Sequence, residues 1–387
     1  MMDPTGNPTG TFRIGPIRPP SEATSLLLQV TNGCTWNKCR FCRIYRHTKF
    51  KAYSADSIRR DIDTMVLYAQ RARRHRDSRG RWDIDSLNRE IMMSKGDERQ
   101  CFYMVANWLV NGGENVFLQD GNTTALSSGR LTDVLVYLRQ AFPGIKRITS
   151  YGRAENLSRI SAEEFAELKA AGLDRIHSGF ESGSDAVLSL INKGTTAQQE
   201  ITAGRNIKAG GIELSVYFMP GIGGRDLTAE NPEGMAEVIN SISPDFVRIR
   251  TAVVKPGTEL YDDFLTGKYT LCSDDEKILE IRRLIEASET EGTVLVSDHI
   301  INLLQQVSGR LDTDRDRMLG IIDGYLGMPE EERVMFRLAR RMAKVISPDD
   351  MKRLSEADIE DIRHIMYTTA DSYSLEVKIN NMMCSFI

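Results

Sequence analysis

Three cysteines lie close together near the beginning of the chain, in the stretch TNGCTWNKCRFCRIY. Cys34, Cys39 and Cys42 have the spacing C-x4-C-x2-C, and no fourth cysteine lies near them in the sequence. Thiolates at this spacing can hold a small inorganic core, and a [4Fe–4S] cluster needs one ligand for each iron. Three protein ligands would leave one iron open to a substrate or cofactor. The triplet therefore predicts a cluster with one open iron.

Two other interpretations of these cysteines are open at this point. His47 could complete a structural zinc site, because three cysteines and one histidine close a tetrahedral shell. Such sites usually pair two knuckles across a longer loop, and this sequence has no second C-x2-C. A disulfide with a spare thiol is disfavoured by six cysteines in 387 residues without a secretory signal. The other three cysteines, Cys101, Cys272 and Cys384, are scattered and predict no second cluster.

The composition is that of an ordinary globular protein, with 41% hydrophobic and 27% charged residues. No apolar run approaches the ~20 residues that cross a bilayer. The beginning of the chain is rich in proline and glycine and lacks the basic-then-apolar order of a signal peptide, so we expect a cytoplasmic protein without a membrane span. A net charge of −4 makes bulk nucleic acid an unfavoured partner, although tRNA stays open.

Short apolar strands alternate with longer helices in the elements that must position the cysteines. Strands are expected at residues 25–30, 116–119, 148–151, 174–180, 212–219 and 246–254. Helices are expected at residues 131–141, 161–171, 185–192, 197–209 and 235–242. This alternation predicts right-handed βαβ units and a parallel sheet. Six strands are too few for a closed eight-stranded barrel, so the expected fold is α/β, a partial (β/α)6 TIM-like barrel.

The order of these elements suggests three parts. An extended segment at 1–24 precedes the barrel at 25–264, which carries an insertion at 51–112. A mainly helical domain at 265–387 is expected to cap the barrel and to exclude water from it. Functional side chains of such folds lie where strands end. The cysteine triplet follows the first strand directly, and Asp120 follows the second.

Together these motifs resemble the radical S-adenosylmethionine (radical SAM) superfamily. The commonest cysteine spacing in that family is one residue shorter than this one. VFLQDGNTTAL resembles the second-strand motif that holds the methionine amino group, with Asp120-Gly121-Asn122 in place of Gly-Gly-Glu. A literal Gly112-Gly113-Glu114 precedes the strand and is interpreted as an unrelated turn. DRIHSGFESGSDAVLSLINKG and PGTELY are similar to the branch that contains coproporphyrinogen dehydrogenases and methylthiotransferases. The resemblance covers residues 25–262.

The resemblance implies a role for individual positions. Cys34, Cys39 and Cys42 would bind three irons, and the methionine amine and carboxylate of SAM would bind the fourth. The remaining residues would contact SAM: Phe41 and Ile222 near the adenine, Asp120, Gly121 and Asn122 at the ammonium, Ser150 and Arg153 at the carboxylate, Glu181 and Ser182 at the ribose, and Lys193 and Tyr217 without a specified group. An arginine suits the carboxylate because its guanidinium is a planar fork of donors.

The resemblance also implies an activity. A reduced cluster would cleave SAM, and the resulting 5′-deoxyadenosyl radical would abstract hydrogen from a small-molecule or peptide substrate in an oxidoreductase or transferase reaction. Reduced flavodoxin or ferredoxin would supply the electron. The alternative is a non-catalytic haem- or cluster-handling protein, because relatives in this branch include haem chaperones. Asp298 and His299 could face the site as a proton donor or substrate contact, or could simply begin a helix.

Overall fold

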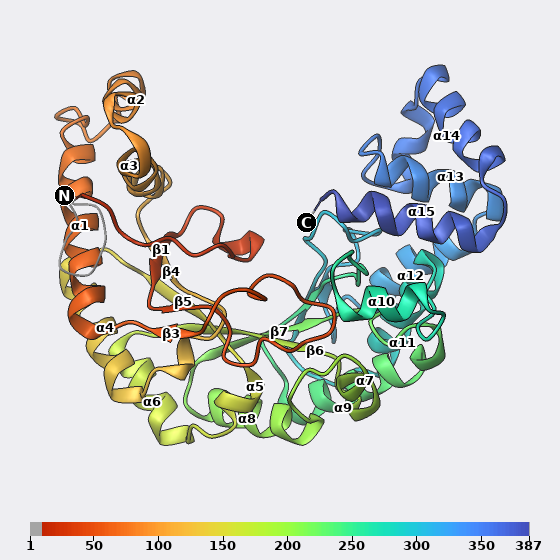
Figure 1. Ribbon diagram of the computed structural model, residues 1–387, viewed down its shortest axis with the longest axis horizontal. Coiled ribbons are helices and arrows are strands. Elements are labelled where there is room, and N and C mark those ends of the chain that lie inside the picture. Colours follow the sequence, from red (N-terminus) through yellow and green to blue (C-terminus); the bar gives the residue numbers. More distant parts are fainter. Residues whose placement is uncertain (1–9, 387) are drawn as a thin grey trace. The chain divides into compact units, whose positions relative to one another are not determined.

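The structure is a computed structural model that describes residues 10–386 (Figure 1). The first nine residues of the expected segment 1–24, and the last residue of the chain, lie outside the described residues. The chain divides into two compact units. The first contains residues 10–35, His47–His177 and Asn206–Glu213, and the second contains Trp36–Arg46, Ser178–Arg205 and residues 214–386.

A mostly parallel sheet confirms the expected α/β class. Its strand order is β1-β4-β5-β6-β7-β8-β9-β10. The strands are β1 (Leu26–Gln29), β4 (Asn115–Gln119), β5 (Arg147–Gly152), β6 (Arg175–Glu181), β7 (Glu213–Phe218), β8 (Phe246–Ile249), β9 (Val294–Val296) and β10 (Gly309–Arg310). The six expected strands are all present, and within residues 10–386 the sheet does not close into a barrel. The sixth strand was expected to reach 254, but β8 ends at Ile249.

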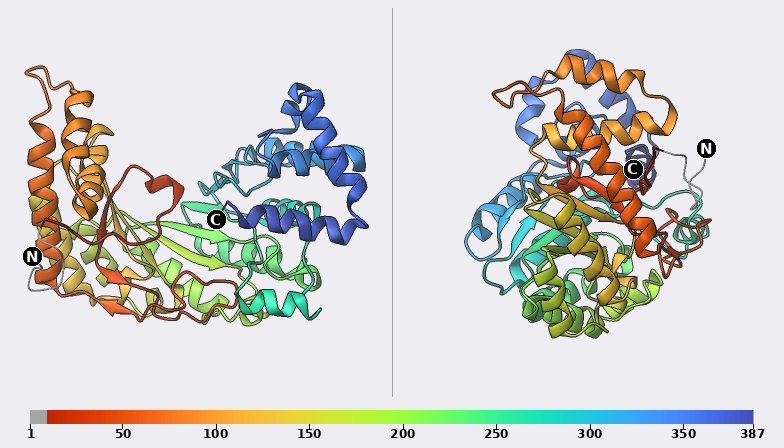
Figure 2. Two further views of the ribbon diagram at one scale, coloured as in Figure 1. Left: turned by 45° about the horizontal axis from the view of Figure 1, so that its top comes forward. Right: turned by 90° about the vertical axis from the view of Figure 1, so that its left-hand side faces the viewer.

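The first unit is built on β1, β4 and β5, which pair in parallel. Helices α1 (Ala55–Arg73) and α3 (Gly96–Val110) pack on β1, and α1 also packs on α4 (Ser128–Ala141), which contacts α6 (Ala162–Ala171) (Figure 1, Figure 2). The shorter elements here are η1 (Pro20–Glu22), β2 (Thr31–Asn32), β3 (Lys51–Ala52), α2 (Ile84–Met93), η2 (Thr123–Ala125) and α5 (Ala154–Leu157). The expected insertion at 51–112 therefore consists mainly of α1, α2 and α3.

Local sequence signals explain where α6 begins and ends. The Ser161 hydroxyl accepts a hydrogen bond from the backbone N–H of Glu164, and the Glu164 carboxylate accepts one from the N–H of Ser161. This capping box pairs two donors that the helix cannot pair internally. Gly172 ends the helix with φ 111°, a left-handed conformation that glycine adopts without steric cost. The predicted cap residues at both ends of this helix are confirmed.

The second unit contains β7, β8 and β9 in parallel, with β10 antiparallel to β9. Its helical elements are α7 (Asp185–Leu190), η3 (Arg225–Leu227), α9 (Glu230–Ile242), α10 (Glu259–Leu265), α11 (Asp274–Ala287), α12 (Arg315–Leu326), α13 (Glu330–Arg341), η4 (Pro348–Arg353), α14 (Glu356–Thr368) and α15 (Ser372–Cys384). Helix α8 (Ala197–Ala209) contributes to both units. Helices α13, α14 and α15 lie together, in blue, in Figures 1 and 2. The segment from 265 onward, expected to be mainly helical, also carries β9 and β10. No helix within residues 10–386 is long and apolar enough to cross a membrane.

Candidate functional site

The cysteine loop is anchored to its surroundings by backbone groups. In the second unit, the N–H of Arg40 donates to Ile191 O at 2.9 Å, and the N–H of Leu260 donates to Arg40 O at 3.0 Å. The Trp36 indole N–H donates to Asn192 O at 2.8 Å. These bonds hold the backbone of the loop on both sides of Cys39, so its conformation is set by the fold.

None of the six cysteines forms a disulfide within residues 10–386, which disagrees with the disulfide interpretation. Cys39 is buried, and Cys34 and Cys42 are partly buried. His47, which a zinc site would need, is exposed. Within residues 10–386 no group of three His, Cys, Asp or Glu side chains is arranged to hold a single metal ion.

In the first unit, Asn122 connects several predicted site residues. Its side-chain amide donates to Thr35 Oγ1 at 2.9 Å and to Asn156 Oδ1 at 2.6 Å. Its Oδ1 accepts from the N–H of Arg153 at 3.2 Å. Asn122 is fully buried, so these bonds lie in a low-dielectric environment where they strongly restrain geometry. The structure thus joins the turn after β4 to the residue after Cys34 and to the end of β5.

Two further groups of this unit are suited to bind a carboxylate. The Arg153 Nη1 lies 4.0 Å from Cys34 Sγ, and the side chain is 8% exposed. The Ser150 hydroxyl is buried and has no hydrogen-bond partner within the described residues. A buried hydroxyl without a partner costs free energy unless a ligand or water pairs with it. The expected carboxylate contacts therefore remain chemically reasonable.

Asp120 and Gly121 follow the end of β4. Asp120 is fully buried, its N–H donates to Thr31 Oγ1 at 3.1 Å, and the Gln29 amide donates to its Oδ2 at 3.4 Å. Gly121 lies in the turn between Asp120 and Asn122. Thr31 and Gln29 were missed by the sequence analysis, although both lie at the end of the first strand where such contacts are expected.

In the second unit, an ion pair joins two of the predicted SAM contacts. Lys193 Nζ lies 2.9 Å from Glu181 Oε1, and the same ammonium lies 5.9 Å from the centre of the Phe41 ring. Glu181 has φ 71°, an uncommon conformation for a non-glycine residue. The Ser182 hydroxyl accepts from the N–H of Ser184 at 3.1 Å, which is a local turn contact. Three predicted residues, Phe41, Glu181 and Lys193, are thus brought together.

The expected adenine segment, Met219–Ile222, is held by buried polar groups that the sequence analysis missed. Glu280 Oε2 accepts from the N–H of Gly221 at 2.9 Å and from the Asn231 amide at 2.7 Å. The Tyr269 hydroxyl donates to Gly221 O at 2.8 Å. Ile222 is fully buried in an apolar cluster against which Phe41 packs. A glutamate on the buried face of a helix is the sequence signal that could have identified Glu280.

Burial gives Glu280 an unusual titration. Desolvation raises the pKa of its carboxyl to about 8, although the hydrogen bonds from Gly221 and Asn231 act to lower this pKa. The unfolded chain therefore loses this proton near its ordinary pKa, whereas the folded protein keeps it up to about pH 8. The carboxyl thus favours the unfolded state increasingly as the pH rises through this window.

Replacing Glu280 with glutamine should remove this pH dependence. The relevant range lies between the pKa of this carboxyl in the unfolded chain and its pKa in the folded protein. As the pH rises through this range, we expect the free energy of unfolding of wild type to fall by about 1 kcal/mol per pH unit relative to that of Glu280→Gln. Urea unfolding of both proteins at pH 5, 6.5 and 8 measures the difference. A constant difference across this range would show that Glu280 is ionised throughout.

Asp298 and His299 lie in a segment without helix, so the helix start expected there is wrong. Asp298 Oδ2 forms an ion pair with Arg248 Nη1 at 2.7 Å. His299 Nδ1 accepts from the N–H of Ile301 at 3.4 Å. The main partner of Asp298 is therefore a strand arginine.

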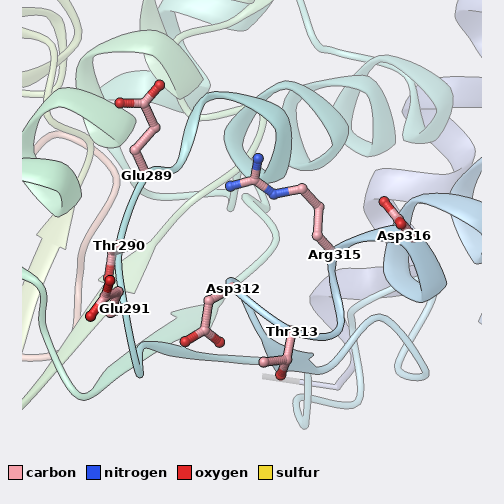
Figure 3. A pocket seen from close by; sticks show the side chains of 7 residues that line it. All are labelled: Glu289, Thr290, Glu291, Asp312, Thr313, Arg315 and Asp316. Atoms are coloured by element: carbon pink, nitrogen blue, oxygen red, sulfur yellow. The ribbon is translucent and has the colours of Figure 1, made fainter.

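A separate hollow in the second unit contains none of the predicted site residues (Figure 3). Its lining residues are Glu289, Thr290, Glu291, Asp312, Thr313, Arg315 and Asp316. Because most of its charged groups are carboxylates, it is poorly suited to an anionic ligand.

Comparison with known families identifies the domain. Residues 89–236 match the radical SAM superfamily. These residues of the chain form a radical SAM domain. The match begins after the cysteine triplet, so it supports the radical SAM domain independently of those cysteines. It also supports the two cofactors expected from the sequence, a [4Fe–4S] cluster and SAM.

This chain matches only part of the length of its curated relatives. The tRNA uridine(34) acetyltransferase of Methanocaldococcus jannaschii is 27% identical over 118 residues, which are 30% of this chain and 22% of that protein. The 4'-phospho-dehydrooxetanocin synthase of Priestia megaterium is 24% identical over 63% of this chain and 29% of that protein. The heme chaperone HemW of Bacillus subtilis is 21% identical over 46% of this chain and 47% of that protein. The chain thus spans less than half the length of each.

Solved structures with similar folds are distant. The cobalamin-dependent SAM radical enzyme OxsB is 13% identical, with 94% of this chain and 58% of that chain covered and a TM-score of 0.45. Methylornithine synthase PylB is 14% identical, with 87% and 85% covered and a TM-score of 0.40.

Proposed function

We propose that this chain is an enzyme that cleaves SAM reductively at a [4Fe–4S] cluster bound by Cys34, Cys39 and Cys42. When bound, the cluster and SAM would supply a 5′-deoxyadenosyl radical for hydrogen abstraction from a substrate. The radical SAM domain at 89–236 is the observation that carries the proposal. The spacing of the triplet, in a loop held by hydrogen bonds and without a disulfide among the described residues, supports it.

The residues at the ends of β4 and β5 would orient the methionine part of SAM. Asp120 would accept hydrogen bonds from the ammonium, since a charge-assisted bond is stronger than a neutral one. Arg153 and the unpartnered hydroxyl of Ser150 would donate to the carboxylate. Asn122, held by several buried hydrogen bonds, would keep Arg153 in place.

Glu181, Lys193 and Phe41 would orient the nucleoside part. Glu181 would accept from the ribose hydroxyls, and its ion pair with Lys193 would fix the carboxylate. Phe41 would pack near the adenine, beside the apolar cluster that contains Ile222. The buried Ile222, with the partly buried Phe41 and Glu181, would limit the access of water to the cofactor.

The partners and location follow from this proposal. Reduced flavodoxin or ferredoxin would supply the electron, and a small molecule or peptide would supply the hydrogen. A cytoplasmic location would keep the thiols reduced. The second candidate is a non-catalytic haem- or cluster-handling protein, which the likeness to a heme chaperone favours.

An anaerobic cleavage assay separates the two candidates. The full chain is reconstituted with iron and sulfide, reduced with dithionite and incubated with SAM. We expect 5′-deoxyadenosine and methionine to form together, as measured by chromatography, because the open iron binds SAM for reduction. Haem binding without SAM cleavage would support the chaperone instead.

A further inference from the structure

Two arginines lie at the end of the sixth expected strand, Arg248 within β8 and Arg250 directly after its last residue. Tyr217 of β7 lies opposite Arg248 in the parallel register, and Arg250 follows two residues later. Because side chains alternate along an extended chain, Arg250 continues the face of Arg248. The alternate residues, Val247 and Ile249, are buried in the core.

The first of these arginines has a full set of partners. Arg248 Nη1 lies 2.7 Å from Asp298 Oδ2, and Arg248 Nε donates to Ser215 Oγ at 3.1 Å. The side chain is buried. Its charge is therefore neutralised within the protein.

The backbone around Arg250 is held firmly. Its N–H donates to Phe218 O at 2.8 Å. The Asn302 side chain bonds to the residues on both sides, donating to Ile249 O at 2.9 Å and accepting from the N–H of Thr251 at 3.1 Å. Buried hydrogen bonds of this kind restrain the position from which the arginine side chain extends.

The side chain of Arg250 has no internal counter-ion. It is partly exposed and forms no ion pair or side-chain hydrogen bond within the described residues. Its guanidinium carbon lies 5.8 Å from the centre of the Tyr217 ring, a weak cation–π contact that leaves all five N–H donors available. Arg248, on the same face, differs because its guanidinium pairs with Asp298.

Other cations lie near Arg250. The guanidinium of Arg43 donates to Pro256 O at 3.0 Å, next to Lys255. Burial, followed by repulsion from Arg43 and Arg250, lowers the pKa of the Lys255 ammonium. Arg43, Lys255 and Arg250 are therefore close enough to repel one another electrostatically.

We propose that Arg250 binds a carboxylate or phosphate group of the substrate. A guanidinium pairs with either anion through two parallel hydrogen bonds, which fixes orientation as well as charge. The restrained backbone lowers the entropic cost of binding. The inference deepens the proposed function and rests on it, since it names the chemical class of the substrate of the same enzyme.

Binding of inorganic phosphate to the reconstituted full chain tests this directly. We expect phosphate to raise the melting temperature of wild type at constant ionic strength. Arg250→Gln should weaken the apparent affinity by about tenfold or more, because it removes a charge-assisted pair, and Arg250→Lys should retain part of it. Arg205→Gln, at an exposed arginine without an ion pair in the described residues, is the control and should match wild type. Equal phosphate binding by wild type and Arg250→Gln would overturn the proposal.

A second readout separates the substrate anion from the carboxylate of SAM. In the absence of substrate, SAM cleavage by Arg250→Gln should proceed with an unchanged KM for SAM. A tenfold rise in that KM would assign Arg250 to SAM and overturn the proposal. Absence of SAM cleavage in wild type would instead refute the proposed function, while the phosphate measurement would still report on Arg250.

Discussion

Replacing Cys39 with serine is expected to abolish both the iron–sulfur chromophore and SAM cleavage. Cys39 is buried at 8% exposure, and the N–H of Cys42 donates to its carbonyl at 3.2 Å in a tight turn. A serine hydroxyl is a hard, protonated ligand at neutral pH and cannot replace a thiolate on iron. Iron and sulfide content, absorbance near ~400 nm and 5′-deoxyadenosine formation measure the loss.

Cys101→Ala provides the matched control. Burial raises the pKa of the Cys101 thiol to about 11, so this thiol stays protonated at neutral pH and is a poor metal ligand. We expect this variant to retain the cluster and the cleavage activity. A Cys39→Ser protein that kept its colour, iron and activity would show that the triplet does not bind the cluster.

Replacing Asp274 with alanine is expected to destabilise the second unit by about 3–5 kcal/mol. Asp274 is buried, and its carboxylate oxygens form three ion pairs. They lie 2.9 Å from Arg341 Nη2, 3.7 Å from Arg337 Nε and 3.6 Å from Lys277 Nζ. It joins α11 to α13, and Arg337 also pairs with Glu376 of α15. Removal of the carboxylate takes away the ion-pair partner of the buried Arg341 and Lys277 and leaves Arg337 with Glu376 alone. The free energy of unfolding in urea at pH 7 measures the effect.

The pH dependence of this effect has a definite sign. Arg341, Lys277 and Arg337 hold the pKa of Asp274 well below its ordinary value, despite burial. The stabilisation is therefore present above the unfolded pKa of about 4 and is lost as the pH falls below it. Asp323→Ala removes an exposed partner of Arg282 and should have a much smaller effect. Equal losses in the two variants at pH 7 would contradict the importance of burial.

The pattern of short strands and helices was sufficient to predict the α/β class. Hydrophobic periodicity and helix-capping residues are local properties of the sequence. They were therefore sufficient to predict, within a few residues, the strands β4, β5 and β7 and the capping box of α6. Boundaries failed where tertiary contacts replace local ones. The chain after Ile249 was expected to continue as a strand, but there Asn302, from a distant segment, bonds to Ile249 and Thr251 in place of a strand partner.

The candidate site shows the same division. The cysteine spacing and the Asp120-Gly121-Asn122 turn are short motifs, so they could be recognised from residue types alone. The hydrogen bonds that Glu280 accepts from Gly221 and that Asn122 accepts from Arg153 join residues far apart in the sequence. No local pattern encodes such contacts, because many different residues could occupy either side of them.

The sequence by itself therefore determined the parallel α/β class, the cysteine triplet and the family resemblance, since each depends on neighbouring residues. Only the tertiary structure decided which charges are neutralised. Arg248 and Arg250 are equivalent in the sequence pattern, yet Asp298, fifty residues away, pairs with Arg248, and Arg250 has no ion pair within the described residues. Electrostatic pairing depends on distance in space, and that distance is set by the fold.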